Sequence, residues 1–152
     1  MAVTAFFTRF EDLAFKEMRA CTVPPGNDVP AGEYGFLEFY CDDLRCDCRR
    51  VMIRVIGQHS GDKVWATIGY GWEKPAFYRK WAGTDQMDAN ELCRPILDPL
   101  NPQSPQAEFF LSMFVEMIKD KTYVDRLKRH YEMFRAAHPK SAARPGSGGM
   151  FG

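Results

Sequence analysis

Three consecutive stretches of the chain have the composition of β-strands and are separated by short turns, which constrains the fold more than any other feature. The stretches are residues 34–40, 49–56 and 63–70. Each is rich in β-branched and aromatic side chains, which favour strands. Because consecutive strands joined by short connections usually pair with each other, the pattern predicts an antiparallel meander of three or more strands.

The middle stretch alternates between apolar and basic residues. Its apolar members are Val51, Ile53 and Val55, and its basic members are Arg50 and Arg54. Successive side chains of a strand point to opposite faces of the sheet. One face of the predicted sheet is therefore committed to a core, and the other is at least partly in contact with water.

A helix is predicted before the sheet and a rigid connector after it. Apolar residues recur every three or four positions between residues 7 and 18, which is typical of an amphipathic helix. Residues 22–32, rich in Pro and Gly, predict a loop. Four prolines between residues 94 and 105 exclude a regular helix there, and we expect this connector to run back along the sheet.

Two helices are predicted after the connector. Ser104 and Pro105 are typical of a helix start, and residues 105–119 are apolar on almost every side, so this helix lies in the core or in a homodimer interface. Thr122 and Asp125 resemble a capping box that opens the last helix. The fold class is therefore α+β: a small antiparallel sheet packed by an N-terminal helix and a C-terminal helical hairpin.

Length and composition indicate one domain. The chain has 152 residues, of which 45% are apolar, and we expect a single domain over residues 1–138 and a disordered tail over residues 139–152. Twenty basic residues balance twenty acidic ones, which argues against a protein that coats nucleic acid or an anionic membrane. No apolar run approaches the roughly 18 residues of a membrane helix, and no signal-peptide pattern is seen at the start, so we expect a soluble, cytoplasmic protein.

The turn between the first two predicted strands contains three cysteines. Cys41, Cys46 and Cys48 lie within eight residues, and the two stems of a hairpin turn can bring their sulfurs together. Zinc takes thiolate ligands in a tetrahedron, so the turn is a candidate zinc knuckle. Cys93, near the start of the connector, is the best candidate for a fourth ligand, and His59 is the second.

The fourth position has further alternatives. An aspartate of the same turn or a water molecule can also fill it; the aspartates are Asp42, Asp43 and Asp47. Four protein ligands would make the site structural, whereas an open fourth position would permit catalysis.

The three thiols also have explanations that need no metal. Free cysteines are among the most buried residue types, so they can simply be small core side chains. They can also be redox-active, in which case Arg45, Arg49 and Arg50 would stabilise a thiolate. No arrangement of residues in the sequence specifies a reaction, so enzyme and non-enzyme hypotheses stand side by side.

The cysteine turn also carries a family resemblance. The pattern Y-C-D-D-x-x-C-D-C-R-R-V over residues 40–51 resembles the signature of a family of uncharacterised prokaryotic proteins, as do residues 97–104 and 129–131. The resemblance covers most of residues 31–134 and implies a single-domain family to which no activity is attached. Cys93 is not part of that signature.

A basic surface is the third candidate feature. Four arginines on the predicted strands and turn, with neighbouring aromatic residues, can hold a single strand of nucleic acid; they are Arg45, Arg49, Arg50 and Arg54, with Tyr34, Phe36 and Tyr40. The aspartates of the turn would repel phosphate, which makes this the weakest hypothesis. The leading one is a small interaction or regulatory protein with a zinc-stabilised turn, and the alternative is a thiol-redox or metal-dependent enzyme.

Overall fold

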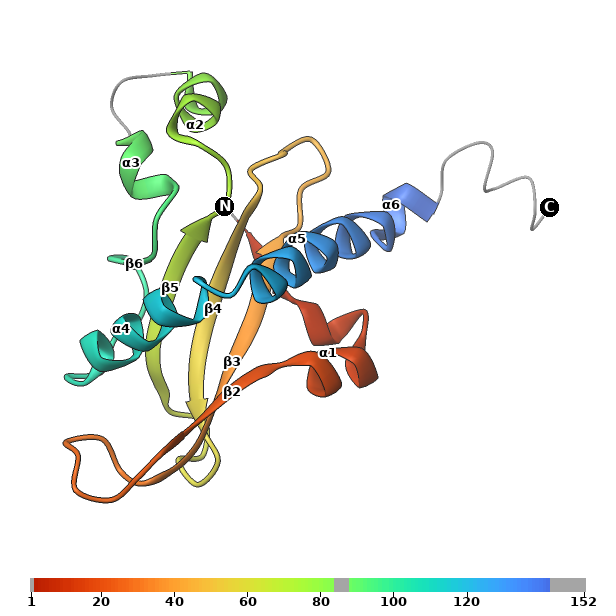
Figure 1. Ribbon diagram of the computed structural model, residues 1–152. Helices are drawn as coiled ribbons and strands as arrows, with labels where there is room; N and C mark the ends of the chain where they lie inside the picture. Colours follow the sequence, from red (N-terminus) through yellow and green to blue (C-terminus); the bar gives the residue numbers. More distant parts are fainter. Residues whose placement is uncertain (1, 84–87, 143–152) are drawn as a thin grey trace.

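The computed structural model describes residues 2–83 and 88–142, and six strands within them form one antiparallel sheet. The strand order is β1-β3-β4-β5-β6, and β2 also pairs with β3. The strands are β1 Val3–Ala5, β2 Arg19–Val23, β3 Gly32–Cys41, β4 Arg50–Gly57, β5 Val64–Gly71 and β6 Ile96–Leu97. Figure 1 shows the three long strands at the centre of the molecule.

The predicted meander is confirmed. Strands β3, β4 and β5 follow one another in the chain and pair antiparallel, with Ile53 of β4 opposite Glu38 of β3 and Ile68 of β5. Every second residue of β4 is buried, as the apolar and basic alternation predicts. The sheet therefore has one face in the core and a second face that is partly open.

The N-terminal segment is more divided than its periodicity predicts. The helix expected over residues 7–18 is limited to α1, Glu11–Glu17, preceded by β1 and a short 3-10 helix, Phe6–Thr8. Strand β2 follows α1 directly. The outer edge of β3 explains this arrangement, because β1 and β2 pair with its two ends and satisfy backbone groups that would otherwise be left without partners.

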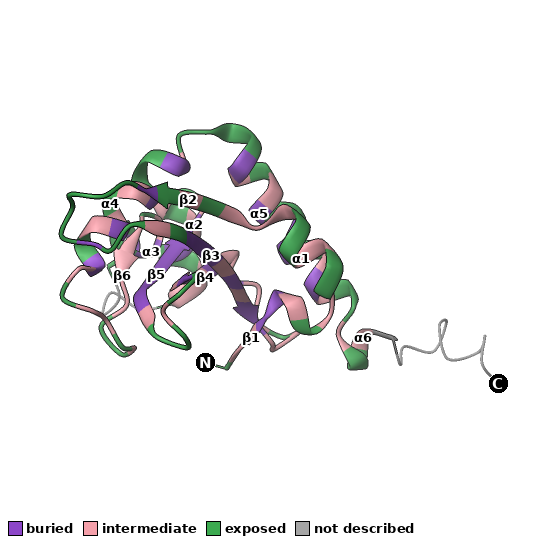
Figure 2. Cartoon of the chain, turned by 90° about the horizontal axis from the view of Figure 1, so that it is seen from below, coloured by how far each residue is buried: buried purple, intermediate pink, exposed green. Residues whose placement is uncertain are grey.

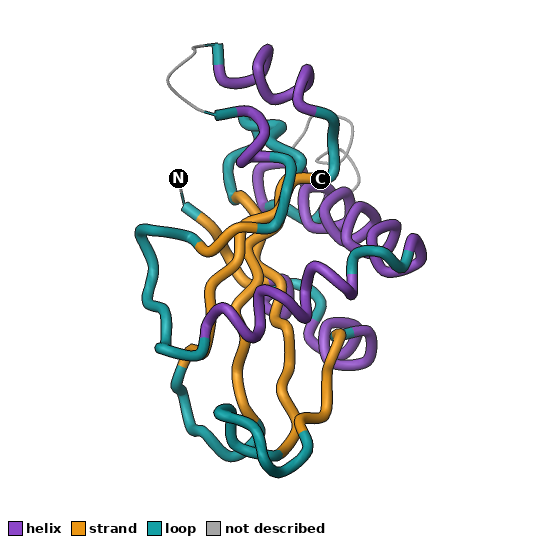
Figure 3. Tube along the Cα trace, turned by 60° about the vertical axis from the view of Figure 1, so that its left-hand side comes forward, coloured by secondary structure: helices purple, strands orange, loops and turns teal. Residues whose placement is uncertain are grey.

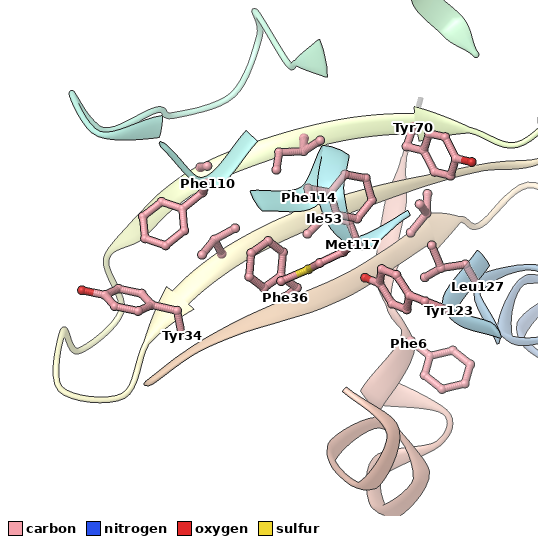
Figure 4. Close-up of a cluster of buried hydrophobic side chains, with 14 of the residues drawn as sticks. Phe6, Tyr34, Phe36, Ile53, Tyr70, Phe110, Phe114, Met117, Tyr123 and Leu127 are labelled. Carbon is pink, nitrogen blue, oxygen red and sulfur yellow. The ribbon is translucent and has the colours of Figure 1, made fainter. Parts of the chain in front are cut away.

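The C-terminal helical hairpin covers the buried face of the sheet. It consists of α4, Ala107–Met117, and α5, Lys121–Ala136, which cross β3 to β5 in Figure 1. Figure 4 shows Phe110 and Phe114 of α4 against Phe36 and Ile53, with the rings of Phe36 and Phe114 stacked at 6.4 Å. In Figure 2 the buried residues concentrate on the sheet and on the inner sides of these helices.

Both helix starts differ slightly from the predicted ones. Ser104 does receive a backbone N–H, that of Gln106, at 3.1 Å, but α4 begins at Ala107. Helix α5 is capped by Asp120, whose side chain accepts the N–H of Thr122 at 3.0 Å, so the cap lies before the predicted Thr122. Aspartate and threonine are both good N-cap residues, so Asp120 can accept a free N–H of the first turn in place of Thr122.

Core packing accounts for the apolar composition of α4. Phe110, Phe114 and Met117 are buried, and Val115 is the large apolar side chain of this helix that is most exposed, at 38%. A homodimer through residues 105–119 therefore stays a prediction. In the described part of the chain, no helix combines the length and apolarity needed to cross a bilayer.

The proline-rich connector runs back along β5, as predicted. After β6, the side chain of Gln103 accepts the N–H of Thr67 at 2.9 Å and donates to its carbonyl at 2.8 Å, as a neighbouring strand would. The hydroxyl of Ser104 donates to the carbonyl of Trp65 at 2.7 Å. The connector thus extends the sheet edge, and Figure 3 shows it as the loop beside the strands.

The segment after α5 contains one more helical turn. Pro139–Ala142 forms α6, although the disordered tail was expected to start at residue 139. His138 explains the turn, because its Nδ1 accepts the N–H of Lys140 at 3.0 Å. The rest of the expected tail, residues 143–152, lies outside the described residues.

Candidate metal centre and adjoining pocket

The structure brings the three cysteines of the turn together. Cys41 ends β3, Cys48 precedes β4, and Cys46 lies between them in the turn. The three sulfur atoms lie within 4.8 Å of one another, and Cys41 and Cys48 are buried. The three thiols are therefore close enough to one another that they could hold one metal ion.

An unusual backbone conformation follows the last of these cysteines. Arg49 has φ 47°, in the left-handed region that residues other than Gly rarely adopt. Two buried tyrosines hold it there: the hydroxyl of Tyr131 accepts the N–H of Arg49 at 3.2 Å, and that of Tyr78 donates to its carbonyl at 2.8 Å. Such strain persists only where the surroundings fix it, and it is common at functional sites.

Helix α5 and the residues after it hold the rest of the turn. The guanidinium of Arg135 donates to the carbonyl oxygens of Cys46 at 2.5 Å and of Leu44 at 3.1 Å. His138 places its Nε2 3.2 Å from the carbonyl oxygen of Asp42. The backbone around the thiols is therefore anchored by side chains that are distant in the sequence.

The aspartates of the turn are all engaged with cations. Each forms an ion pair with an arginine; the pairs are Asp42–Arg9, Asp43–Arg45 and Asp47–Arg49. For Asp42 and Asp47, partial burial raises the carboxyl pKa, but the paired arginine and other neighbouring donors and cations together outweigh it, so the pKa is lowered. These carboxylates stabilise the turn, and none of them joins the thiol group.

The thiols influence one another strongly. A hydrogen bond from Cys48 lowers the pKa of Cys41 to about 6. The same hydrogen bond, with burial, raises the pKa of Cys48, and burial raises that of Cys46. One thiolate is thus stabilised by its neighbours, whereas three thiolates together require a cation to balance their charge.

Neither predicted distant ligand belongs to this group. Cys93 directly follows α3, Ala89–Leu92, and its sulfur lies 3.6 Å from the carbonyl oxygen of Asn90. His59 is exposed in the turn after β4, at the opposite end of that strand from Cys48. Within the described residues the thiol group has three members, and a ligand role for Cys93 stays a prediction.

The four arginines do not share one surface. The side chain of Arg45 is 92% exposed beside Asp43, whereas Arg49 pairs with Asp47 and Glu73. Arg50 and Arg54 lie on β4 and point to the second face of the sheet, where the guanidinium of Arg54 lies 4.7 Å from the centre of the Phe39 ring.

The aromatic residues expected beside the arginines lie in the core. Tyr34, Phe36 and Tyr40 are at most 2% exposed and lie under the helical hairpin, on the face of the sheet opposite Arg50 and Arg54. They do not form an exposed platform for bases. Binding of single-stranded nucleic acid is left with no observation in its favour among the described residues.

A pocket of about 370 Å³ adjoins the thiol group on the second face of the sheet. Cys41 and Cys48 line one part of it, and Arg50 and Met52 of β4 line another. Trp81 also lines it and belongs to α2, Pro75–Ala82. Sequence reasoning missed this pocket. The one sequence signal for it is Gly69 of β5, which lines the pocket and leaves room for the guanidinium of Arg50.

No protein-family model matches the chain, and comparisons with curated proteins and with solved structures found no similar protein. Function is therefore inferred from the geometry of the thiol group and of the pocket beside it.

Proposed function

We propose that Cys41, Cys46 and Cys48 bind one zinc ion as thiolates. The observation that carries the proposal is the approach of three sulfurs to within 4.8 Å of one another. Zinc–sulfur bonds of about 2.3 Å in a tetrahedron separate the sulfurs by about 3.8 Å, so small side-chain rotations complete the site. The divalent ion supplies the positive charge that three neighbouring thiolates need.

The described residues would supply this ion with three ligands and leave its fourth position to another donor. The aspartates of the turn are engaged in ion pairs, and the described residues offer no fourth thiol or imidazole in the group. Water or a molecule from the adjoining pocket takes this position. The ion fixes the turn that joins β3, β4 and α5, which is consistent with an interaction or regulatory role for the surface around it.

Thiol–disulfide chemistry is the alternative that the same geometry favours. Two of the three thiols would form a disulfide and pass two electrons and two protons to a small disulfide such as oxidised glutathione. Cys41 is the candidate nucleophile because Cys48 stabilises its thiolate by a hydrogen bond. This alternative requires a metal-free protein, since a bound zinc ion occupies the thiolates.

Metal analysis of protein purified without added metal tests the proposal. We expect one zinc ion per chain and a melting temperature that falls when a chelator removes it. Cys48→Ser should abolish both effects. Cys21→Ser is the matched control, because Cys21 lies outside the turn and contacts Met113, with 3.7 Å between the sulfur atoms. Absence of metal, together with melting that a chelator does not change, would contradict the zinc site, and a reversible disulfide would then support the alternative.

A further inference from the structure

The pocket on the second face of the sheet has the size and lining of a small-molecule site. Its volume of about 370 Å³ falls within the range of roughly 300–1,000 Å³ that is usual for ligand pockets. Most of its lining is apolar and comes from separate parts of the chain; it includes Phe39, Met52, Trp81, Leu92, Ile96 and Leu100. A molecule bound there would bury an apolar body.

One cation lies among these apolar walls. Arg50 lines the pocket, and its Nε donates to the carbonyl of Leu92 at 3.1 Å. Its two terminal nitrogens have no hydrogen bond or ion pair with any other residue that the structure describes. Arg50 is half-buried, so its terminal N–H donors lie at an apolar wall without an acceptor in the described part of the protein, and a ligand that supplies acceptors forms charge-assisted hydrogen bonds with them.

The position of Arg50 is fixed by the neighbouring strand. The guanidinium lies over Gly69 of β5, where a Cβ atom would be 2.9 Å from its Nη2. With the Leu92 carbonyl holding Nε, the flat group is oriented before any ligand arrives. A fixed fork of donors is suited to a carboxylate, which accepts two parallel hydrogen bonds.

The groups that face Arg50 do not neutralise it directly. They are Asp98, Cys48 and the hydroxyl of Tyr78. Asp98 lines the pocket, but its carboxylate accepts the N–H of Leu100 at 2.8 Å and forms no ion pair with Arg50. The hydroxyl of Tyr78 donates to the carbonyl of Arg49. Arg50 therefore keeps donors free for a ligand.

We propose that this pocket binds a small organic acid, with its carboxylate on Arg50 and its apolar body against Met52, Trp81 and Ile96. The proposal goes beyond the zinc site and does not depend on it. Because Cys48 also lines the pocket, a bound acid lies next to the thiol group. The pocket is then a ligand site directly beside the cysteine turn.

NMR titration tests the proposal. The protein is labelled with the isotope ¹⁵N, used as purified, and titrated with three matched probes. The probes are naphthylacetate, naphthylacetamide and naphthylethylamine, which share an aromatic body and end in an anion, a neutral amide and a cation. We expect the acid to shift the indole signal of Trp81 and the amide signal of Gly69, and to bind roughly tenfold more tightly than the amide. The amine should bind most weakly.

Three variants assign the preference to the pocket. Arg50→Gln should reduce binding of the acid to the level of the amide, whereas Asp98→Asn should strengthen it several-fold because a competing negative charge is removed. Arg54→Gln is the matched control, since Arg54 lies on the same strand and face but outside the pocket. If acid and amide bind equally, if the shifts occur away from Trp81 and Gly69, or if neither Arg50→Gln nor Asp98→Asn changes the preference, the proposal is wrong.

Discussion

The phenol oxygen of Tyr131 accepts the backbone N–H of Arg49 at 3.2 Å and so joins α5 to the residue that follows the last cysteine of the turn. The same hydroxyl donates to Asp47 at 2.9 Å. One side chain thereby supports the left-handed backbone of Arg49 and positions the segment between Cys46 and Cys48. Tyr131 thus supports the residues on both sides of Cys48.

Tyr131→Phe should weaken both stability and metal binding. The ring is retained, but the N–H of Arg49 loses its partner, which costs about 1–3 kcal/mol in the free energy of unfolding. Chemical denaturation with and without zinc measures both effects, because weaker binding reduces the stabilisation by zinc. Tyr34→Phe is the control: its hydroxyl donates to the Pro30 carbonyl at 2.6 Å, away from the turn, so zinc should stabilise this variant as it does the wild type. Equal stabilisation of Tyr131→Phe by zinc would contradict the supporting role.

The buried imidazole of His130 is expected to make stability depend on pH. Its Nδ1 and Nε2 each lie 2.7 Å from a carboxylate oxygen, of Glu38 and of Glu17 respectively. Burial alone would lower the pKa of His130, but hydrogen bonds and charge interactions with the two glutamates outweigh it, so the pKa is raised above the usual 6.5. The stabilisation is fully present below that usual value and is lost as the pH rises through the raised one.

His130→Gln should remove this pH dependence. Below pH 6.5 we expect a loss of roughly 3–5 kcal/mol in the free energy of unfolding, because Glu38 is left buried without its cation. The difference in the free energy of unfolding between His130→Gln and the wild type should become smaller as the pH rises. At the acid end it should also shrink, since the hydrogen bond from His130 lowers the pKa of Glu17 and protonation of Glu17 breaks the pair.

Urea denaturation across the pH range provides the measurement, and Arg129→Gln provides the control. Arg129 also pairs with Glu17, but its side chain is 53% exposed, so its loss should cost less than about 1 kcal/mol. Parallel pH profiles for His130→Gln and the wild type would show that the imidazole carries no such stabilisation.

The parts of the fold that are encoded locally could be predicted, and those set by distant pairing could not. Strands β3, β4 and β5 each have a β-branched and aromatic composition and are separated by short turns, and β4 also alternates between buried and half-buried residues. Strands β1 and β6 have three and two residues, which is too short for a pattern, and they form because the edges of the sheet offer free backbone groups. Glu38 is a similar case. The sequence around it is compatible with either a buried or an exposed glutamate, and it is buried because His130 of α5 contacts its carboxylate.

The candidate site divides in the same way. Three cysteines within eight residues are visible in the sequence, and their approach needs only a hairpin. Their supports, Tyr131 and Arg135, contact the turn from 82 and 89 residues further along the chain. The pocket combines β3, β4, β5, α2 and the connector, so it exists only in the folded chain.

The number of cysteine ligands can be decided with two single substitutions. Loss of a residue that only hydrogen-bonds to a metal ligand typically lowers metal affinity roughly 10–100-fold. Cys48→Ser removes a ligand itself, so it should lower zinc affinity by at least as much. Cys93→Ser should change the affinity by less than about twofold, because the thiol of Cys93 contacts the Asn90 carbonyl and lies outside the thiol group. Competition with a chromophoric chelator measures both. A comparable loss in Cys93→Ser would show that Cys93 supplies a fourth thiolate.

The two glycines of β5 should respond differently to the same added methyl group. In Gly71→Ala the new Cβ collides with the hydroxyl of Tyr78 and with the backbone carbonyl of Leu92, so α2 and α3 must move, at about 1–3 kcal/mol. In Gly69→Ala it meets the Arg50 guanidinium at the end of a flexible side chain, so the loss of stability should be smaller but binding of naphthylacetate should fall. Chemical denaturation and the NMR titration separate the two effects. If Gly69→Ala binds the acid as the wild type does, Arg50 is not held over β5 in the way its ligand role requires.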